Sequence, residues 1–187
     1  SDVELATRVA KLAGQLVLEL RESFGVVEPD DKARRKQLKD DADRAAHDLI
    51  VGELAQHRPG DAVLSEEGID QAQRADADRV WIVDPLDGTA EYGKGLADFA
   101  IHIALWERSE TDDSGLAVGV VDLPAAGITR TTADLPVELP TLDGDRPVRL
   151  VVSRSRPPAL AGAGLERFSA QLADAGVTEQ GVEVVSV

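Results

Sequence analysis

Two aspartates and a glycine follow an apolar run in the segment WIVDPLDGT, residues 81–89. The apolar residues from Val80 to Val83 have the length and composition of a buried β-strand. The carboxylates of Asp84 and Asp87 therefore stand where a strand leaves the core and reaches the surface. The intervening proline fixes a bend, so both side chains can face inward with the carbonyl oxygen of Leu86 between them.

Gly88 and Thr89 complete this segment with groups suited to a phosphate. A glycine lets the backbone come close to a ligand, because it carries no side chain. The amides of the two residues can form a small nest for a phosphate oxygen, and the threonine hydroxyl can orient a water molecule. An Asp-Gly pair is also typical of a hairpin turn, so residues 87–88 keep that second interpretation.

A second acidic cluster, LSEEG at residues 64–68, follows another short apolar run, residues 62–65. Carboxylates at adjacent strand ends repel each other strongly in a partly dry site. Mg²⁺ relieves such repulsion, since it prefers hard oxygen ligands and is held by one or two carboxylates, waters and substrate phosphate. The two clusters together predict a magnesium site at Glu66, Asp84 and Asp87. A solvent-exposed pair of glutamates is the alternative, and the spacing alone leaves both open.

Two helices are predicted before these clusters. Apolar residues recur at three- and four-residue steps over Val3–Glu22, which predicts a well-buried helix. A second helix is predicted from Ala42 to Leu54, with Asp40 or Asp41 as its cap. The stretch between the two helices, Val26–Lys39, is charged and aperiodic, and it predicts an exposed, mobile loop.

After the second helix the hydrophobic period changes to two residues, which indicates strands. A turn at residues 124–127 joins two of them into a hairpin. A last helix is expected from Leu160 to Ala175, with two prolines near its first turn. The order helix, helix, strands, helix, strand predicts an α+β fold of layered helices and sheet. The expected strands cover residues 62–65, 80–83, 99–106, 116–121, 128–132, 148–153 and 182–187.

The chain has 187 residues, no cysteine, and a formal net charge of −15 from 35 acidic and 20 basic side chains. This charge argues against binding nucleic acid through its phosphates, which requires clustered Lys and Arg. No apolar run approaches the roughly 20 residues that span a bilayer, so no membrane partner is expected. The lack of cysteine is compatible with the cytoplasmic location that we expect. Methionine is absent even at position 1, and the chain stops on a predicted strand, so we expect it to be part of a longer gene product.

The segment DPLDGT, residues 84–89, resembles the signature of the inositol monophosphatase superfamily, the magnesium-dependent, lithium-sensitive phosphatases. Ser65-Glu66-Glu67 is similar to the upstream acidic motif of that superfamily. Residues 42–47 are similar to its helix-start segment, with Asp43 at the acidic position. Within the superfamily, the chain most resembles the CysQ-type 3′(2′),5′-bisphosphate nucleotidases, and the resemblance covers nearly the whole chain. The stretches that carry it are residues 64–67, 84–92, 99–106 and 153–157.

The resemblance implies an active site that holds two or three Mg²⁺ ions. Its implied metal ligands are Glu66, Asp84, the Leu86 carbonyl oxygen and Asp87. Its implied catalytic residues are Asp43, Glu66 and Thr89. Its implied substrate-binding residues are Asp87, Gly88 and Thr89. In this arrangement Asp43 and Thr89 position or deprotonate the attacking water.

The implied architecture is the N-terminal half of an αβαβα sugar-phosphatase fold, with layered helices and an antiparallel sheet. Residues 1–153 are expected to form a metal-binding α+β domain, and residues 154–187 the start of a C-terminal α/β domain. Two departures from the family pattern stand out. Residues 38–41 replace a Pro-Val-Thr-like approach to Asp43, and the chain holds no downstream Trp-Asp motif, which in the family supplies a further metal-binding aspartate.

The implied reaction removes the 3′-phosphate of adenosine 3′,5′-bisphosphate or its sulfated relative, in sulfur assimilation. The partner is therefore a small phosphorylated substrate. Hydrolysis of inositol 1-phosphate or fructose 1,6-bisphosphate is the alternative, because these reactions use the same metal core. A non-catalytic module that binds metal or phosphate is a second alternative. The resemblance also allows a homodimer.

The histidines are expected to be structural. His47 and His102 lie on apolar patterns, which favours packed or hydrogen-bonded side chains over metal ligands. His57 stands at a helix exit and is expected at the surface. Residues 153–155 are expected to cap the last helix, and phosphate binding by Arg154 or Arg156 is the alternative.

Overall fold

The computed structural model describes residues 1–66, 76–109, 115–134, 136, 144–153 and 163–186. Contacts within the chain divide it into two compact units, Ser1–Leu135 and Pro136–Val187. The expected boundary followed residue 153, but the strand at residues 148–152 pairs with the last strand of the chain and belongs to the second unit. Within the described ranges, no helix combines the length and apolar character needed to cross a membrane.

Helix α1 (Asp2–Phe24) confirms the first predicted helix. Ser1 caps it, because the serine side chain accepts a hydrogen bond from the Glu4 N–H while the Glu4 carboxylate accepts one from the N-terminal ammonium group. Small residues let the helix approach the sheet closely: a Cβ atom added at Gly14 would lie 2.5 Å from Oδ2 of Asp122. The fully buried stripe of α1 consists of Ala6, Val9, Ala10, Ala13 and Val17.

Helix α2 (Lys32–His57) begins well before the second predicted helix. Most of the loop predicted over Val26–Lys39 is therefore helical, and the predicted cap at Asp40 or Asp41 is wrong. Asp31 is the cap, since its Oδ1 atom accepts a hydrogen bond from the Arg34 N–H at 2.9 Å. The sequence pattern missed this start because the first six helical residues are polar except for one alanine and carry no apolar period. A buried stripe at four-residue steps then holds the helix on the core, at Leu38, Ala42, Ala46, Ile50 and Leu54.

Five strands make up the sheet of the first unit: β1 (Ala62–Ser65), β2 (Arg79–Asp87), β3 (Ala100–Glu107), β4 (Gly115–Leu123) and β5 (Ile128–Thr131). They lie in the order β1-β2-β3-β4-β5. The pairs β2–β3, β3–β4 and β4–β5 are antiparallel, but β1 is parallel to β2, so the sheet is mixed rather than antiparallel throughout. The parallel pair has a consequence for the site, because the carboxyl ends of β1 and β2 lie at the same end of the sheet.

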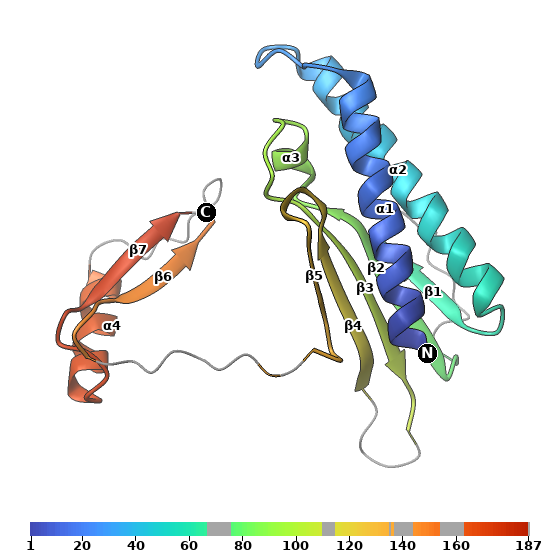
Figure 1. Cartoon of the computed structure of the whole chain (residues 1–187). Coiled ribbons are helices and arrows are strands. Elements are labelled where there is room, and N and C mark those ends of the chain that lie inside the picture. Colours follow the sequence, from blue (N-terminus) through green and yellow to red (C-terminus); the bar gives the residue numbers. More distant parts are fainter. Residues whose placement is uncertain (67–75, 110–114, 135, 137–143, 154–162, 187) are drawn as a thin grey trace. The chain divides into compact units, whose positions relative to one another are not determined.

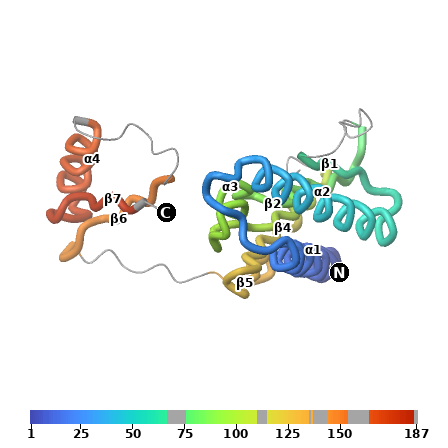
Figure 2. The backbone as a smooth tube through the Cα atoms, turned by 90° about the horizontal axis from the view of Figure 1, so that it is seen from above, coloured from blue at the N-terminus to red at the C-terminus, as the bar shows by residue number. Residues whose placement is uncertain are grey.

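Helices α1 and α2 lie side by side along one face of the sheet, as Figures 1 and 2 show. Alternate strand residues point to this face, and Trp81 and Ile103 are at most 1% exposed there. Ile82 and Val121 point to the other face, and each is 38% exposed. The core therefore fills the space between two helices and a sheet, which confirms the layered α+β class. The predicted turn at residues 124–127 is also confirmed, as a 3-10 turn, η2 (Pro124–Ala126), that ends at a left-handed glycine.

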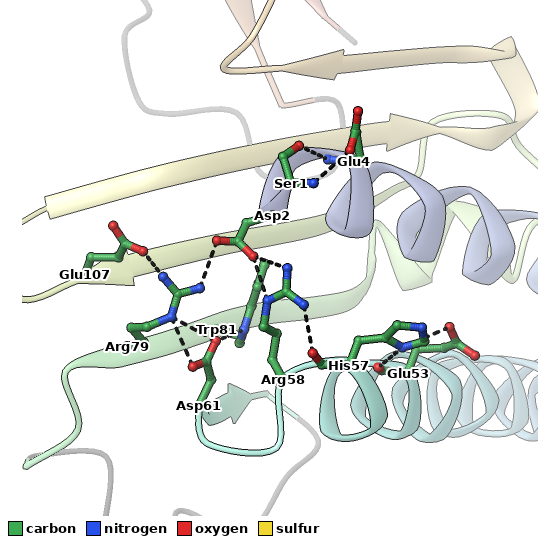
Figure 3. Close-up of polar contacts among 10 residues, drawn as sticks. All are labelled: Ser1, Asp2, Glu4, Glu53, His57, Arg58, Asp61, Arg79, Trp81 and Glu107. Atoms are coloured by element: carbon green, nitrogen blue, oxygen red, sulfur yellow. Dashed lines mark hydrogen bonds and ion pairs between the residues drawn. The ribbon is translucent and has the colours of Figure 1, made fainter.

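An ion-pair cluster ties the start of α1 to the start of β2 (Figure 3). Arg79 donates to Asp2 at 2.9 Å and to Asp61 at 3.0 Å, and Arg58 donates to Asp2 at 2.7 Å. The indole Nε1 of Trp81 donates to the second oxygen of Asp61 at 2.8 Å. The cluster thus joins residues up to 77 positions apart in the sequence, and the sequence analysis did not anticipate it.

The second unit contains β6 (Val148–Val152), α4 (Ala163–Asp174) and β7 (Val182–Ser186). β6 and β7 are parallel neighbours, with α4 between them in the sequence, so the unit has the βαβ order of an α/β fold. The cap considered for residues 153–155 and the phosphate-binding role of Arg154 or Arg156 fall, apart from Ser153, on positions outside the described residues. The two prolines expected near the first turn of α4 also lie outside them.

Candidate metal centre

Residues 81–87 form the greater part of β2, and Gly88 and Thr89 follow the end of the strand. Asp84 faces His102 and Asp87 faces Ala100 on β3, so the register shifts between the two aspartates. Such a bulge adds one residue to one strand and bends it. The Leu86 N–H donates to Oδ1 of Asp84 at 3.2 Å, which closes the bend. Residues 87–88 are therefore not a hairpin turn: Asp87 is the last residue of β2, and helix α3 (Thr89–Tyr92) begins two residues later.

Gly88 connects the strand to α3 in a conformation that requires glycine. Its φ angle is +81°, in the left-handed region. A Cβ atom at this position would lie 2.6 Å from the Asp98 carbonyl oxygen and 3.1 Å from the Cα of Phe99. The neighbouring backbone is thus one reason for a glycine here, and the close approach of a ligand stays a prediction. Thr89 follows as the first residue of α3.

The parallel pairing of β1 and β2 brings Glu66 near Asp84. The Glu66 N–H donates to the Val83 carbonyl oxygen at 3.3 Å, so the pairing continues one residue past the end of β1. Glu66, Asp84 and His102 all line one groove with a volume of about 730 Å³. Its apolar lining comes from neighbouring strands and includes Ile82.

Asp84 is half-buried, and its environment disfavours the charged form. Burial is the main cause that raises the pKa of the Asp84 carboxyl, and the negative charge of Asp87 raises it further. His102 and the Leu86 N–H oppose this shift without reversing it. A cation in the groove would favour the carboxylate form and remove the repulsion between the two aspartates.

Asp43 lies in the interior of α2, with its Oδ1 atom buried. Lys39 and His47 stand one turn before it and one turn after it, on the same side of the helix. The stem of Lys39 packs where α3 ends, since a Cβ atom at Gly93 would lie 2.8 Å from the Lys39 Cγ. His47 is within hydrogen-bonding distance of Ser65, the residue before Glu66. α2 is therefore attached to the end of β1 and to the end of α3, with Asp43 between the two attachment points.

The donor set fits Mg²⁺ better than it fits a metal that needs a complete protein cage. No group of three Asp, Glu, His or Cys side chains converges on one point among the described residues. The Asp87 side chain is 60% exposed, and Glu66 is exposed as well. Mg²⁺ keeps several waters and needs one or two carboxylates together with substrate phosphate, which matches two carboxylates in an open groove. Glu67 lies outside the described residues.

His102 lines the groove, although the apolar pattern around it favoured a packed or hydrogen-bonded side chain outside the site. It faces Asp84 across the β2–β3 pair, and its Nε2 atom lies 3.9 Å from Oδ2 of Asp87. The signal that could have located it is the strand register, which single-strand patterns do not contain. His47 is hydrogen-bonded, as predicted, and His57 is exposed at the end of α2, as predicted.

Comparisons with known proteins agree with these features. A sequence profile described as the inositol monophosphatase family matches residues 2–136. A protein of Mycobacterium leprae named 3′-phosphoadenosine 5′-phosphate phosphatase is 42% identical over 170 residues, which cover 86% of this chain and 59% of that protein. A protein of the same name from Mycobacterium bovis is 41% identical over 155 residues, which cover 79% of this chain and 54% of the relative. The chain thus spans little more than half the length of these relatives.

Solved structures show the same fold. The crystal structure of CysQ from Bacteroides thetaiotaomicron, a bacterial member of the inositol monophosphatase family, superposes with a TM-score of 0.60 at 27% sequence identity. The superposition covers 99% of this chain and 72% of the CysQ chain.

Proposed function

The chain belongs to the inositol monophosphatase family, and on that premise we propose that it carries the metal site of a magnesium-dependent phosphomonoester hydrolase. The proposed reaction removes the 3′-phosphate of adenosine 3′,5′-bisphosphate. The observation that carries the proposal is the position of the half-buried Asp84 beside Glu66, where two parallel strands end above one groove. The raised pKa of Asp84 adds support, because a bound cation would stabilise the carboxylate form that burial and Asp87 disfavour.

Four oxygen donors would be shared among the metal ions in this proposal: Glu66, Asp84, the Leu86 carbonyl oxygen and Asp87. When bound, Mg²⁺ lowers the pKa of a coordinated water and neutralises charge on the transferred phosphoryl group. The bend in β2 fits this ligand set, because it changes the register between Asp84 and Asp87 while both residues stay in the same strand. Two or three ions remain the expected number.

The chain's other site residues would position the reactants. Asp43 and Thr89 would orient the attacking water, the Asp43 carboxylate would accept its proton, and the Gly88 and Thr89 amides would bind a phosphate oxygen. The water oxygen forms a bond to phosphorus while the bond from phosphorus to the 3′-oxygen breaks, and the leaving 3′-oxygen takes a proton from solvent water. Positioning and charge neutralisation lower most of the barrier in such reactions.

The substrate assignment rests on the relatives named 3′-phosphoadenosine 5′-phosphate phosphatase. Inositol 1-phosphate and fructose 1,6-bisphosphate are the alternatives, because the proposed metal core serves any phosphate monoester. A homodimeric assembly and a cytoplasmic location stay predictions within this proposal.

A phosphate-release assay tests the function with the protein expressed from its complete reading frame. We expect Mg²⁺-dependent release from adenosine 3′,5′-bisphosphate, with kcat/KM well above the values for inositol 1-phosphate and fructose 1,6-bisphosphate. Higher kcat/KM on either of these would reassign the substrate. Mg²⁺ binding without release from any of the three would favour the non-catalytic module.

A further inference from the structure

A hydrogen bond joins α2 to the end of β1, beside the proposed metal ligand Glu66. The Nδ1 atom of His47 lies 2.7 Å from the Oγ atom of Ser65, and either atom can donate, depending on the imidazole tautomer. Ser65 is 6% exposed and is the last residue of β1. The bond therefore restrains the residue that directly precedes Glu66 in the chain.

The strand end that carries Glu66 has few other restraints. β1 is four residues long and lies at the edge of the sheet, where β2 is its neighbour among the strands of the described chain. Past the end of β1, the hydrogen bond from the Glu66 N–H to the Val83 carbonyl oxygen is long, at 3.3 Å. A side-chain bond one residue earlier is thus a substantial part of what holds this backbone in place.

The same bond relates Glu66 to Asp43. His47 and Asp43 are one helical turn apart on α2, about 6 Å along the helix axis. Because α2 is rigid over one turn, attaching His47 to Ser65 also sets the distance between Asp43 and the end of β1. Lys39 packs against Gly93 on the other side of Asp43, so the helix is held on both sides of this residue.

We propose that His47 is a positioning residue of the metal site, which holds Glu66 in place relative to Asp43 through Ser65. The inference rests on the proposed function, because it assigns Glu66 and Asp43 the roles given above. Partners of metal ligands typically contribute about 10- to 100-fold in metal affinity or activity. Positions in an active site must hold to within roughly 0.5 Å. In this proposal, the bond between Ser65 of β1 and His47 of α2 provides this precision.

The test compares His47→Ala, Ser65→Ala, their double variant and His47→Asn in the complete protein. Calorimetry measures the affinity for Mg²⁺, and steady-state assays measure kcat and KM for adenosine 3′,5′-bisphosphate. We expect His47→Ala and Ser65→Ala each to weaken Mg²⁺ binding and lower kcat by about 10-fold or more, with little change in KM. The double variant should match the single ones, because both remove the same bond. The asparagine amide should restore much of the loss, since its nitrogen can occupy the place of Nδ1.

The matched control is His57→Ala, which removes an exposed histidine from the far end of the same helix. It should leave Mg²⁺ affinity and kcat unchanged. Wild-type Mg²⁺ affinity and kcat in His47→Ala and Ser65→Ala, with a lower Tm, would overturn the proposal and make the bond a stabilising contact only. If His47→Ala does not fold, as judged by circular dichroism, Ser65→Ala decides the question alone.

The outcomes also separate this proposal from the proposed function. A wild-type protein that binds Mg²⁺ without hydrolysing any substrate would refute the function, and the calorimetric comparison would still decide the role of His47. A wild-type protein that binds no Mg²⁺ would overturn both.

Discussion

Asp87 is a residue at which the proposed metal site can be changed with little effect on the fold. Its side chain is 60% exposed, and it ends β2. We predict that Asp87→Asn in the complete protein lowers kcat/KM by at least about 100-fold, because a neutral amide replaces a charged ligand. The free energy of unfolding should change by less than about 0.5 kcal/mol, as is usual for surface substitutions. Enzyme assays and urea denaturation measure the two effects.

The control for Asp87→Asn is Asp78→Asn. This isosteric change lies one residue before β2, at a side chain that is 84% exposed, and it should leave both kcat/KM and stability as in the wild type. Wild-type turnover in Asp87→Asn would remove this residue from the site.

A substitution at Gly88 tests whether the backbone of the same segment requires a glycine. Gly88→Ala places a Cβ in the left-handed region and 2.6 Å from the Asp98 carbonyl oxygen. We predict a loss of about 2 kcal/mol or more in the free energy of unfolding, since either effect alone costs about 1–2 kcal/mol. Chemical denaturation monitored by fluorescence of the two tryptophans measures it.

Gly52→Ala is the matched control for Gly88→Ala. Gly52 lies inside α2, and a Cβ atom there meets nothing within 4 Å. Alanine in a helix interior should stabilise the protein by up to about 1 kcal/mol. Equal effects of the two substitutions would mean that Gly88 does not need its left-handed conformation.

At the level of helices and strands, the ion pairs of Asp2 fasten α1 to β2 (Figure 3). Burial alone would raise the pKa of the Asp2 carboxyl, but the hydrogen bonds from Arg79 and Arg58 outweigh it and hold the pKa below its usual value. A lowered folded-state pKa contributes stability above the unfolded pKa, near 3.8, and loses it as the pH falls through the folded value. Asp2→Asn should therefore be less stable than the wild type at neutral pH, by about 1 kcal/mol or less.

Urea denaturation over a pH series measures this difference in stability. It should shrink below the usual carboxyl pKa and vanish once Asp2 is protonated in the folded wild type. Asp48→Asn, at an exposed position on α2, is the control and should be as stable as the wild type at neutral pH. A stability difference that stays constant down to acid pH would mean that the charge of Asp2 does not strengthen the attachment.

The elements themselves were largely predictable from the sequence. Short apolar runs located β1 and β2. Alternation of apolar residues located β3, because the two faces of this sheet meet different environments. The start of α2 was not predictable in the same way: its first turns carry charged side chains, and their helical state depends on the cap at Asp31 and on packing that begins at Leu38. Helix ends with a weak apolar period are set by such contacts rather than by pattern.

For the molecule as a whole, lithium gives the test that concerns the family rather than one residue. The family resemblance predicts that lithium inhibits the complete enzyme by replacing one Mg²⁺. We expect phosphate release to fall at millimolar lithium chloride, while sodium and potassium chloride at the same ionic strength have no such effect. Activity that is indifferent to lithium, at saturating and at limiting Mg²⁺, would argue against this branch of the family.

The sequence by itself determined which chemical groups the proposed site contains and the local conformation of the backbone around them. DPLDGT at residues 84–89 and the acidic pair after β1 named the proposed site, because strand ends and glycine turns are encoded by neighbouring residues. Only the tertiary structure decided which of these groups share a neighbourhood. The parallel pairing of β1 and β2 puts Glu66 with Asp84, the β2–β3 register adds His102, and α2 brings His47 to Ser65. Such partners lie far apart along the chain. The packing that joins them depends on side-chain shape and strand order, and the local periodicity of apolar residues carries no information about either.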